Sequence, residues 1–350
     1  MPEATDEVLF EVRGVMGLIT LNRPRAINAL NSPMVLAIQR QLDEWLADES
    51  VRVVVLTGSG DRGLCAGGDI VAIFQDAADG LDTPLTFWRE EYALDVTIAR
   101  YPKPFVALMD GIVLGGGIGL SAHSSHRVVT ERSRLGMPEV TIGFVPDVGG
   151  TYLYSRAPGE LGTHLGLTGG MAAGADAIPL GLADYYVPSE ALPGLIESLE
   201  TTPVEDALAA VSQTPPDSPL MTARTWIDDA YSADSVTGIL DRLTALGTAE
   251  ALEAAATIRT KAPLALSVTL ESLRRARRLP GLDAVLEQEF RVSARSLTNP
   301  DMAEGIRAQV IDKDRNPRWN PATLADVDPA MVADHFEPRA GRELQLPRAS

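Results

Sequence analysis

The stretch VRVVVLTGSGDRGLCAGGD, residues 51–69, indicates the fold class of this chain. It begins with a continuous run of β-branched and apolar residues, VRVVVLTG (51–58), which is typical of a strand buried on both faces of a parallel sheet. Two further runs of this kind follow, PFVALMDG (104–111) and RVVT (127–130). Gly-rich turns and helical stretches separate the three runs. The pattern predicts repeated strand–turn–helix units, and hence an α/β fold.

The residues before this stretch extend the pattern. Residues 8–21 alternate as two short β runs, VLFEVR and LITL, around Gly14 and Gly17. A helix is predicted next, with Ser32 as its N-cap and Pro33 at its first position. The amino-terminal part therefore begins with two strands and a helix.

The chain changes character near residue 190. Beyond it strong strand runs are absent, and Ala/Leu/Glu-rich amphipathic stretches are interrupted by SQTPPDSP (212–219). Apolar residues at helical spacing predict a helix from Asp283 to Leu297. We therefore predict two regions, an α/β core at residues 1–190 and a helical region at residues 191–350.

Composition excludes several classes of protein. The 350 residues carry a formal net charge of −18, whereas binding to nucleic acids or anionic membranes uses basic surfaces. The single cysteine, Cys65, excludes an intramolecular disulfide and a cluster of thiolate metal ligands. The amino-terminal MPEATDEVLF lacks the apolar segment of a secretory signal, and we find no membrane-spanning stretch. We expect a soluble cytoplasmic protein with no nucleic-acid or membrane partner.

Two glycine-rich loops are the first candidates for a site. CAGGD (65–69) and LGGGIG (114–119) each follow a predicted buried strand, and the second could open a helix at its glycines. Backbone N–H groups at such positions lack intrahelical acceptors, and glycine lets a ligand oxygen come close to them. Two such loops could supply one N–H each to a single carbonyl oxygen, as an oxyanion hole requires. The alternative is that these glycines only permit tight backbone packing.

Two acidic residues are the next candidates. Glu139 and Asp147 lie in MPEVTIGFVPDVGG (137–150), a mostly apolar stretch in which each stands beside a proline. Carboxylates in apolar surroundings tend to have shifted pKa values and positioned roles. The alternatives are a helix cap for Glu139 and a turn residue for Asp147.

Four other patterns carry weaker signals. GSGDRG (58–63) matches G-x-G-x-x-G, but no helix is predicted directly after it, so a plain connection is favoured over a dinucleotide site. Cys65 is more typical of a packing residue than of a nucleophile. His123 and His126 could share a helix face, but a metal site would need further ligands. The basic run at 274–278 is typical of a solvated helix face and is also the best local candidate for contacting phosphates.

Taken together, these segments resemble the crotonase, or enoyl-CoA hydratase/isomerase, superfamily. The resemblance is carried by LNRPRAINALN (21–31), CAGGDI (65–70), the GGG loop (115–117) and PEVTIGFVPDVGGTY (138–152). Within the superfamily the chain is more similar to the branch that hydrolyses acyl-CoA thioesters. That similarity is carried by REEY (89–92), GGGIGLS (115–121) and EGIRAQVIDKDRNPRW (304–319). The resemblance implies a crotonase-like spiral of ββα units followed by a helical carboxyl-terminal region, with the acyl-CoA bound by the core and the site completed by that region.

The resemblance also implies roles for individual residues. The family's oxyanion-hole N–H groups correspond to Gly68 and Gly116, and its catalytic acids to Glu139 and Asp147. Glu91 corresponds to a substrate contact, as do Gly116, Glu139 and Asp147. The residues implied along the CoA path are Ala29, Ala66, Gly67, Asp69 and Ile70.

One departure from the hydratase pattern distinguishes the branches. Hydratases of the superfamily usually carry a second catalytic glutamate shortly after the GGG loop, whereas this chain has Gly119 there, as the hydrolases do. The resemblance therefore implies hydrolysis of 3-hydroxyisobutyryl-CoA to hydroxyacid and CoA, a step of valine catabolism, with 3-hydroxypropionyl-CoA as a second candidate substrate. Glu139 would act as the nucleophile or as the general base on water.

The resemblance implies no separate cofactor and no metal, since CoA is part of the substrate and product. A homo-oligomer is a further expectation. Two alternatives stay open at this point: an enoyl-CoA hydratase or isomerase of the same superfamily, and a catalytically silent acyl-CoA-binding protein.

Overall fold

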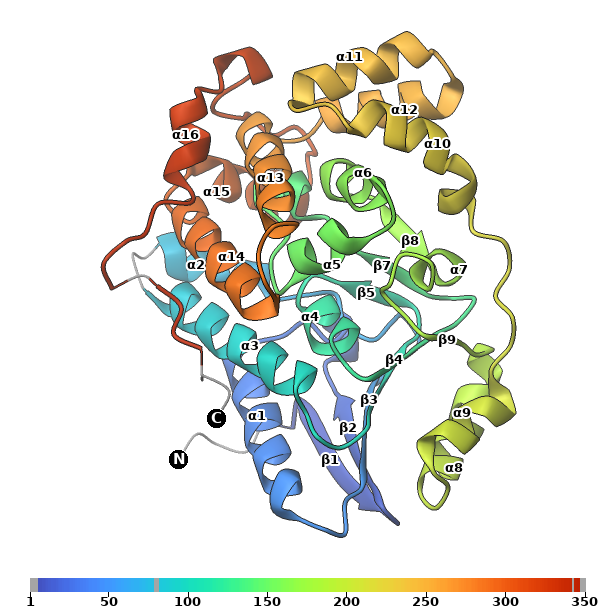
Figure 1. The fold of residues 1–350 in the computed structure, drawn as a ribbon. Helices are drawn as coiled ribbons and strands as arrows, with labels where there is room; N and C mark the ends of the chain where they lie inside the picture. The colour runs from blue at the N-terminus through green and yellow to red at the C-terminus, as the bar shows by residue number, and fades with distance from the viewer. Residues whose placement is uncertain (1–5, 79–81, 342, 347–350) are drawn as a thin grey trace. The chain divides into compact units, whose positions relative to one another are not determined.

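The chain divides into two compact units, each built from several segments. The structure, a computed structural model, describes residues 6–78, 82–341 and 343–346 (Figure 1). Unit 1 comprises the described residues of 1–69, 90–135 and 172–218, and unit 2 those of 70–89, 136–171 and 219–350. The two units therefore differ in their bounds from the regions 1–190 and 191–350 predicted from the sequence, because the chain passes between them several times.

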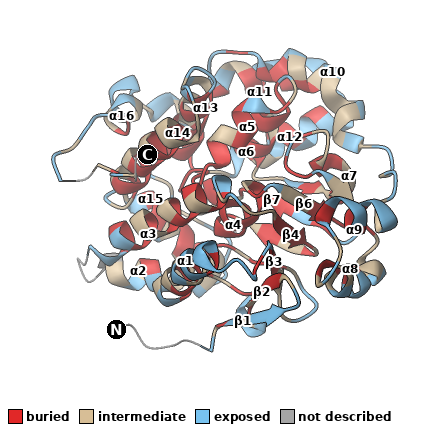
Figure 2. Cartoon of the chain, turned by 60° about the horizontal axis from the view of Figure 1, so that its bottom comes forward, coloured by how far each residue is buried: buried red, intermediate tan, exposed pale blue. Residues whose placement is uncertain are grey.

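Unit 1 is built on a six-stranded sheet with the order β1-β2-β3-β4-β6-β9. Its strands are β1 (Val8–Arg13), β2 (Met16–Leu21), β3 (Val53–Gly58), β4 (Phe105–Met109), β6 (His126–Val129) and β9 (Tyr185–Tyr186). β1 pairs antiparallel with β2, and the other neighbours pair in parallel. The buried parallel strands predicted from the three apolar runs are thus confirmed, and Figure 2 shows β3 and β4 coloured as buried.

Helices cover both faces of this sheet, because successive strand residues point to opposite sides. On one face, apolar residues of the strands pack with α8 (Leu192–Leu199) and α9 (Val204–Val211) in one core cluster. On the other, α1 (Ser32–Ala47) places the ring of Trp45 on Gly17, where an added Cβ would lie 2.7 Å from the ring. The predicted N-cap of α1 is wrong by one residue, because the side chain of Asn31 accepts the N–H of Met34 at 3.0 Å.

Short elements complete unit 1. A second sheet has the order β5-β7-β8, formed by β5 (Ile112–Leu114), β7 (Arg134–Gly136) and β8 (Met171–Ala173). The last residue of β7 and the first of β8 are assigned to unit 2. The helical pieces are η1 (Pro24–Ala26), α4 (Gly116–Ala122), α7 (Gly174–Ala177) and η3 (Ser189–Ala191). α3 (Thr83–Ala99) is divided at residue 89, and its second part belongs to unit 1.

Unit 2 is mainly helical. Its amino-terminal elements are α2 (Ile70–Ala78), the start of α3, η2 (Glu139–Ile142), α5 (Gly150–Arg156) and α6 (Leu161–Thr168). Its later elements are α10 (Pro219–Tyr231), α11 (Val236–Leu246), α12 (Ala249–Arg259), α13 (Pro263–Ala276), α14 (Leu282–Ser296), α15 (Pro300–Ile306), η4 (Arg307–Ile311), η5 (Leu324–Asp326) and α16 (Pro329–Asp334). Within the described residues no strand follows β9, and α14 confirms the helix predicted at 283–297.

The late segment EGIRAQVIDKDRNPRW supports the turn that carries Glu139. A Cβ added at Gly305 would overlap the backbone of Ile142, so α15 packs directly against η2. Immediately after α15, Arg307 bonds Glu304 through two nitrogens at 2.8 Å and pairs with Asp312 and Asp314 at 2.6 and 2.7 Å. The motif therefore has a structural role, in which glycine gives close approach and one arginine joins three carboxylates.

We expect Gly305→Ala to lower the melting temperature, because the new methyl group would push α15 away from η2. Overpacking of this kind costs about 1–3 kcal/mol. Gly194 in α8 is the matched control, since no heavy atom lies within 4 Å of a Cβ added there. Thermal unfolding followed by circular dichroism compares the two variants. Equal stability of Gly305→Ala and Gly194→Ala would contradict the close approach.

Candidate functional site

The loop at residues 65–69 in unit 1 is held by main-chain bonds to Leu30. The N–H of Leu30 donates to the oxygen of Gly67 at 2.8 Å, and the oxygen of Leu30 accepts the N–H of Asp69 at 2.8 Å. In such a parallel bridge the residue between the two bonds directs its own N–H away from the partner. The N–H of Gly68 therefore points away from Leu30, as a donor to a ligand must.

The second glycine loop lies beside the first. Gly116 is the first residue of α4, where its N–H has no acceptor within the helix, so the prediction that this loop opens a helix is confirmed. A Cβ added at Gly67 would lie 3.6 Å from the nitrogen of Gly116. A Cβ at Gly117 would lie 2.7 Å from the oxygen of Cys65. Gly117 thus serves tight packing, while Gly68 and Gly116 present N–H groups on neighbouring segments.

Glu91 lies directly against Gly116. Its side chain comes from the unit 1 part of α3 and is 2% exposed. A Cβ added at Gly116 would overlap Oε1 of Glu91. The structure therefore brings the predicted substrate contact and a predicted oxyanion-hole residue together, and only glycine leaves room for both.

Two of the residues predicted along the CoA path, Ala29 and Asp69, are joined by Arg23, which sequence reasoning did not single out. Its guanidinium donates to the oxygen of Ala29 at 2.6 Å and pairs with Asp69 at 3.0 Å. Ala66 is held by a bond from its N–H to the oxygen of Ile27 at 2.9 Å. Ile70 is the first residue of α2 and belongs to unit 2. In the sequence, Arg23 was marked only by its position in the segment 21–31 that carries the family resemblance.

Asn28 is a second residue that sequence reasoning missed. It is fully buried with a φ of 55°, a left-handed conformation that asparagine tolerates better than most residues. Its amide donates to the oxygens of Ser59, Gly63 and Leu64 at 3.0–3.3 Å. These bonds tie the segment GSGDRG to the core. No helix begins between β3 and α2, so that segment is a connection and not a dinucleotide-binding turn.

Cys65 is a packing residue. It is fully buried, its thiol donates to the oxygen of Asn28 at 3.3 Å, and it accepts the N–H of Gly67 at 3.4 Å. Burial raises the pKa of the Cys65 thiol to about 12, and the nearby Glu91 adds to the rise. The side chain is therefore a neutral thiol at physiological pH, and a role as nucleophile has no basis.

Glu139 opens η2 in unit 2 and is 8% exposed. Its backbone oxygen accepts the N–H of Phe144 at 3.0 Å, which closes the turn. Burial, together with the charge of Glu139, raises the pKa of the Tyr154 hydroxyl. On the same turn Thr141 accepts a hydrogen bond from Lys261 at 2.8 Å, and burial lowers the pKa of that lysine. The structure thus buries the Glu139 side chain, with a tyrosine and a lysine close to its turn.

Asp147 lies in the next turn of unit 2 and is 5% exposed. Its backbone oxygen accepts the N–H of Gly150 at 2.6 Å, so the turn-residue interpretation holds for its main chain. Val148 and Gly149 follow with positive φ values of 50° and 78°. The loop is bonded to Glu289 of α14, a residue that sequence reasoning missed because nothing in its own segment distinguishes it.

The histidine and arginine patterns have structural explanations. His123 is the C-cap residue that follows α4 and His126 begins β6, so the two do not share a helix face. Arg275, Arg277 and Arg278 are exposed, as predicted for a solvated helix face. Arg274 and Arg277 also bond Glu160 at 2.7–3.0 Å. Burial opposes ionisation of Glu160, but the bonds from Arg277 and its other partners lower the pKa of this carboxyl. These two guanidinium groups are thus already paired with a carboxylate.

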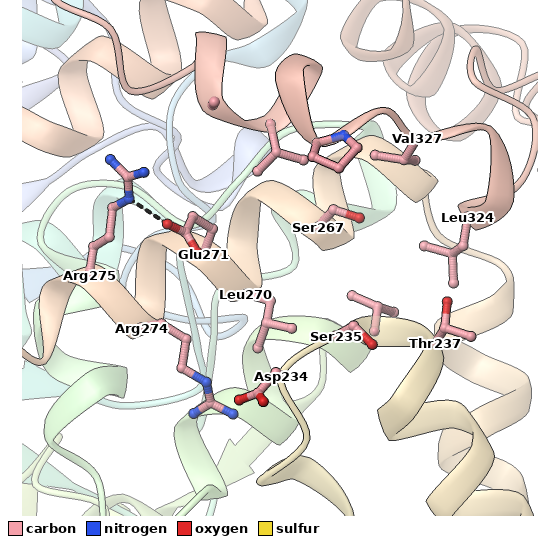
Figure 3. Close-up of a pocket in the computed structure, with 14 residues that line it drawn as sticks. Asp234, Ser235, Thr237, Ser267, Leu270, Glu271, Arg274, Arg275, Leu324 and Val327 are labelled. Carbon is pink, nitrogen blue, oxygen red and sulfur yellow. Dashed lines mark hydrogen bonds and ion pairs between the residues drawn. The ribbon is translucent and has the colours of Figure 1, made fainter.

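A pocket of about 440 Å³ in unit 2 is lined by Arg274 and Arg275 of the basic run, and by none of the residues predicted for the acyl-CoA site (Figure 3). It is lined by the start of α11, by α13 and by the segment from η5 to α16. Arg275 reaches across α13 to Glu271 at 2.6 Å and stacks on the ring of Phe336 at 4.0 Å. Its cation is therefore already matched by a carboxylate.

Within the described residues, no helix has both the length and the apolar character needed to cross a membrane. In the same residues no group of three or more His, Cys, Asp or Glu side chains is arranged to hold a metal ion.

The fold and the two glycine loops define a class, and comparison with known proteins identifies it: the chain belongs to the enoyl-CoA hydratase/isomerase family. The family model matches residues 16–336. A relative from Danio rerio, named 3-hydroxyisobutyryl-CoA hydrolase, mitochondrial, is 39% identical over 98% of this chain and 93% of its own length. The crotonase-like fold and the helical carboxyl-terminal region expected from the sequence are confirmed.

Two solved structures share this fold over nearly the full chain. One, described as a carnitinyl-CoA dehydratase from Mycobacterium thermoresistibile, has a TM-score of 0.94 and 52% identity, and the match covers 97% of this chain and 99% of the other. The second, described as an enoyl-CoA hydratase from Rhodobacter sphaeroides, has a TM-score of 0.92 and 41% identity, with coverage of 97% and 100%.

The cytoplasmic localisation predicted from the sequence is contradicted. The 3-hydroxyisobutyryl-CoA hydrolases to which the chain is similar are named as mitochondrial proteins. The prediction rested on one cysteine and on the composition of the amino-terminal residues, of which 1–5 lie outside the described residues. A reducing environment does not distinguish the cytoplasm from other reducing compartments.

We expect the native protein to show no rapid reaction with a thiol reagent. Because the pKa of the Cys65 thiol is raised to about 12 and the side chain is buried, almost no thiolate exists below pH 9. Titration of the native protein with 5,5′-dithiobis(2-nitrobenzoic acid) should detect no rapidly reacting thiol. After unfolding in guanidinium, one equivalent of thiol should react. One fast equivalent in the native protein would contradict the packing role.

Proposed function

We propose that this protein hydrolyses the thioester of 3-hydroxyisobutyryl-CoA to the free hydroxyacid and CoA, a step of valine catabolism. The observation that carries the proposal is the 39% identity, over 98% of this chain, to a relative named for that activity. The chain also retains both glycine loops and both buried acids.

Hydrolysis of a thioester needs donors for the carbonyl oxygen, which gains negative charge when the carbon is attacked. We assign this role to the N–H groups of Gly68 and Gly116. Backbone donors fixed in advance cost no rearrangement during the reaction, and loss of one such donor typically costs ~2.7–4 kcal/mol in the barrier. The direction of the Gly68 N–H and the start of α4 at Gly116 favour this assignment.

The reaction also needs a nucleophile, and we assign this part to Glu139. An ionised Glu139 carboxylate would attack the carbonyl carbon, and the C–S bond would break with release of the CoA thiolate. Water would then open the resulting anhydride and restore the carboxylate. In the alternative route, Glu139 takes a proton from the attacking water. The thiol of CoA should have a pKa of ~8.5, like that of cysteine, so the thiolate can depart without a strong acid to protonate it.

Asp147 and Glu91 are assigned supporting roles. Asp147 would orient the substrate hydroxyl or the water, or exchange a proton in the second step. Glu91 would contact the substrate from its place against Gly116. The residues Ala29, Ala66, Gly67, Asp69 and Ile70 would line the CoA path. CoA is then part of substrate and product, and the proposal includes no separate cofactor and no metal.

Hydration of an enoyl-CoA is the second candidate, because the two solved structures described above are named a dehydratase and a hydratase. Adding water across a C=C bond requires a pair of acids around one water. Gly119 occupies the position where hydratases of the family usually carry the second glutamate, and it lies buried within α4. This favours hydrolysis.

We further propose that copies of the chain associate, which gel filtration with light scattering would test.

Free-CoA release from 3-hydroxyisobutyryl-CoA, 3-hydroxypropionyl-CoA and crotonyl-CoA separates the two candidates. We expect thiol release from the hydroxyacyl substrates and none from crotonyl-CoA. Loss of enoyl absorbance from crotonyl-CoA without thiol release would favour the hydratase instead. Binding without either reaction would leave only an acyl-CoA-binding role.

We expect Glu139→Gln to lower kcat by at least ~100-fold, the scale of lost acid–base or nucleophilic catalysis, while acyl-CoA binding changes little. The amide has the same shape but cannot attack or accept a proton. Glu190→Gln, at an exposed position of η3, is the control. Assays of CoA release give kcat, and calorimetry gives the affinity for the acyl-CoA substrate. Near-normal turnover of Glu139→Gln would exclude the assignment.

We expect Asp147→Asn to lower kcat as well, by roughly 10–100-fold, because the amide cannot exchange a proton. Asp206→Asn, exposed on α9, is the control. Turnover per folded molecule and melting temperature are measured together. A lower melting temperature with unchanged turnover would show that Asp147 acts only in the turn.

A further inference from the structure

Glu289 has an unusual position for an acidic residue. It lies on α14, is 1% exposed, and belongs to the buried face of that helix. Its Oε2 accepts the N–H of Gly149 at 2.7 Å, and its Oε1 accepts the N–H of Thr151 at 2.8 Å and the Thr151 hydroxyl at 2.5 Å. All three donors belong to the segment that directly follows Asp147.

The segment needs an external anchor. Val148 and Gly149 have φ values of 50° and 78°, and a left-handed conformation costs free energy at a β-branched residue such as Val148. Gly149 precedes α5 and has no side chain with which to cap it. Glu289, about 140 residues away in the chain, supplies the acceptors for the N–H groups of Gly149 and Thr151. The conformation just after Asp147 is therefore held by α14.

The contrast with Glu160 argues for a role beyond stability. Glu160 is also buried, but Arg274 and Arg277 pair with it. In the described part of the chain no Lys, Arg or His forms an ion pair with Glu289. Burial raises the pKa of Glu289 to about 8, the bonds from Thr151 and Gly149 act against the rise, and Asp147 adds to it. A buried carboxyl without a cation is costly, and such groups concentrate at functional sites.

We propose that Glu289 is a positioning residue for thioester hydrolysis, which fixes the carboxyl of Asp147 by holding Gly149 and Thr151. This inference rests on the proposed function. Glu289 does not touch the substrate in this account. Both carboxyl oxygens of Glu289 serve as acceptors, and the amide of a glutamine would replace one of these acceptors with an NH2 group that can only donate.

The test compares Glu289→Gln, Thr151→Val and Thr151→Ser with Glu160→Gln as the buried-acid control. Thr151→Val removes one donor to Glu289 with little change in shape, so it tests the proposal even when Glu289→Gln folds poorly. Thr151→Ser keeps the hydroxyl. Each protein is measured for kcat and KM with 3-hydroxyisobutyryl-CoA, and for amide hydrogen exchange of residues 145–156.

We expect Glu289→Gln to lower kcat by about tenfold or more, the scale of a buried hydrogen-bonding group left unsatisfied. KM should change by less than about twofold. Exchange at residues 145–156 should become faster. Thr151→Val should show the same changes more weakly, and Thr151→Ser should restore both. Glu160→Gln should lower the melting temperature and leave kcat per folded molecule unchanged.

The outcomes separate this inference from the proposed function. Faster exchange with unchanged kcat would overturn the positioning role, and unchanged exchange in Glu289→Gln would overturn the anchor itself. If the wild-type enzyme releases no CoA, the proposed function is wrong, and the catalytic part of this inference is wrong as well. Faster exchange in Glu289→Gln would then still support Glu289 as the anchor of the turn.

Discussion

The close approach of two backbone segments in unit 1, residues 65–69 and 114–117, is the constraint on which the candidate site depends. A side chain at Gly117 would collide with Cys65, and one at Gly116 would collide with Glu91. Glycine therefore keeps the segments together and keeps the N–H groups of Gly68 and Gly116 near each other. Donors fixed in this way by packing are already placed for a developing oxyanion. The candidate oxyanion-hole donors of unit 1 are thus main-chain groups.

The acidic residues depend on a different kind of support. Glu139 and Asp147 lie in two successive turns of unit 2, and helices from the end of the chain hold both turns. α15 packs on the first turn through Gly305, and α14 bonds the second through Glu289. The long carboxyl-terminal region therefore has a role that follows from physical contacts, since without it neither turn has its packing partner or its hydrogen-bond acceptor.

Sequence reasoning predicted the parallel strands, the helical second half and the helix opened by the GGG loop, because periodicity and glycine are local signals. It placed Gly68 and Gly116 through the family resemblance, and the structure supplied their geometry. Long-range partners were missed. Nothing near Glu289 in sequence shows that it bonds a loop about 140 residues away, and nothing near Arg277 shows that it closes on Glu160. Localisation was wrong because composition does not encode it.

The central claim is that the main chain of the two glycine loops binds the thioester oxygen. A crystal structure of the Glu139→Gln variant with bound 3-hydroxyisobutyryl-CoA tests this most directly, because slowed turnover preserves the substrate. The account predicts a carbonyl oxygen within about 3 Å of the backbone nitrogens of both Gly68 and Gly116. A carbonyl oxygen bound away from these two nitrogens, with the acyl chain otherwise ordered, would contradict it.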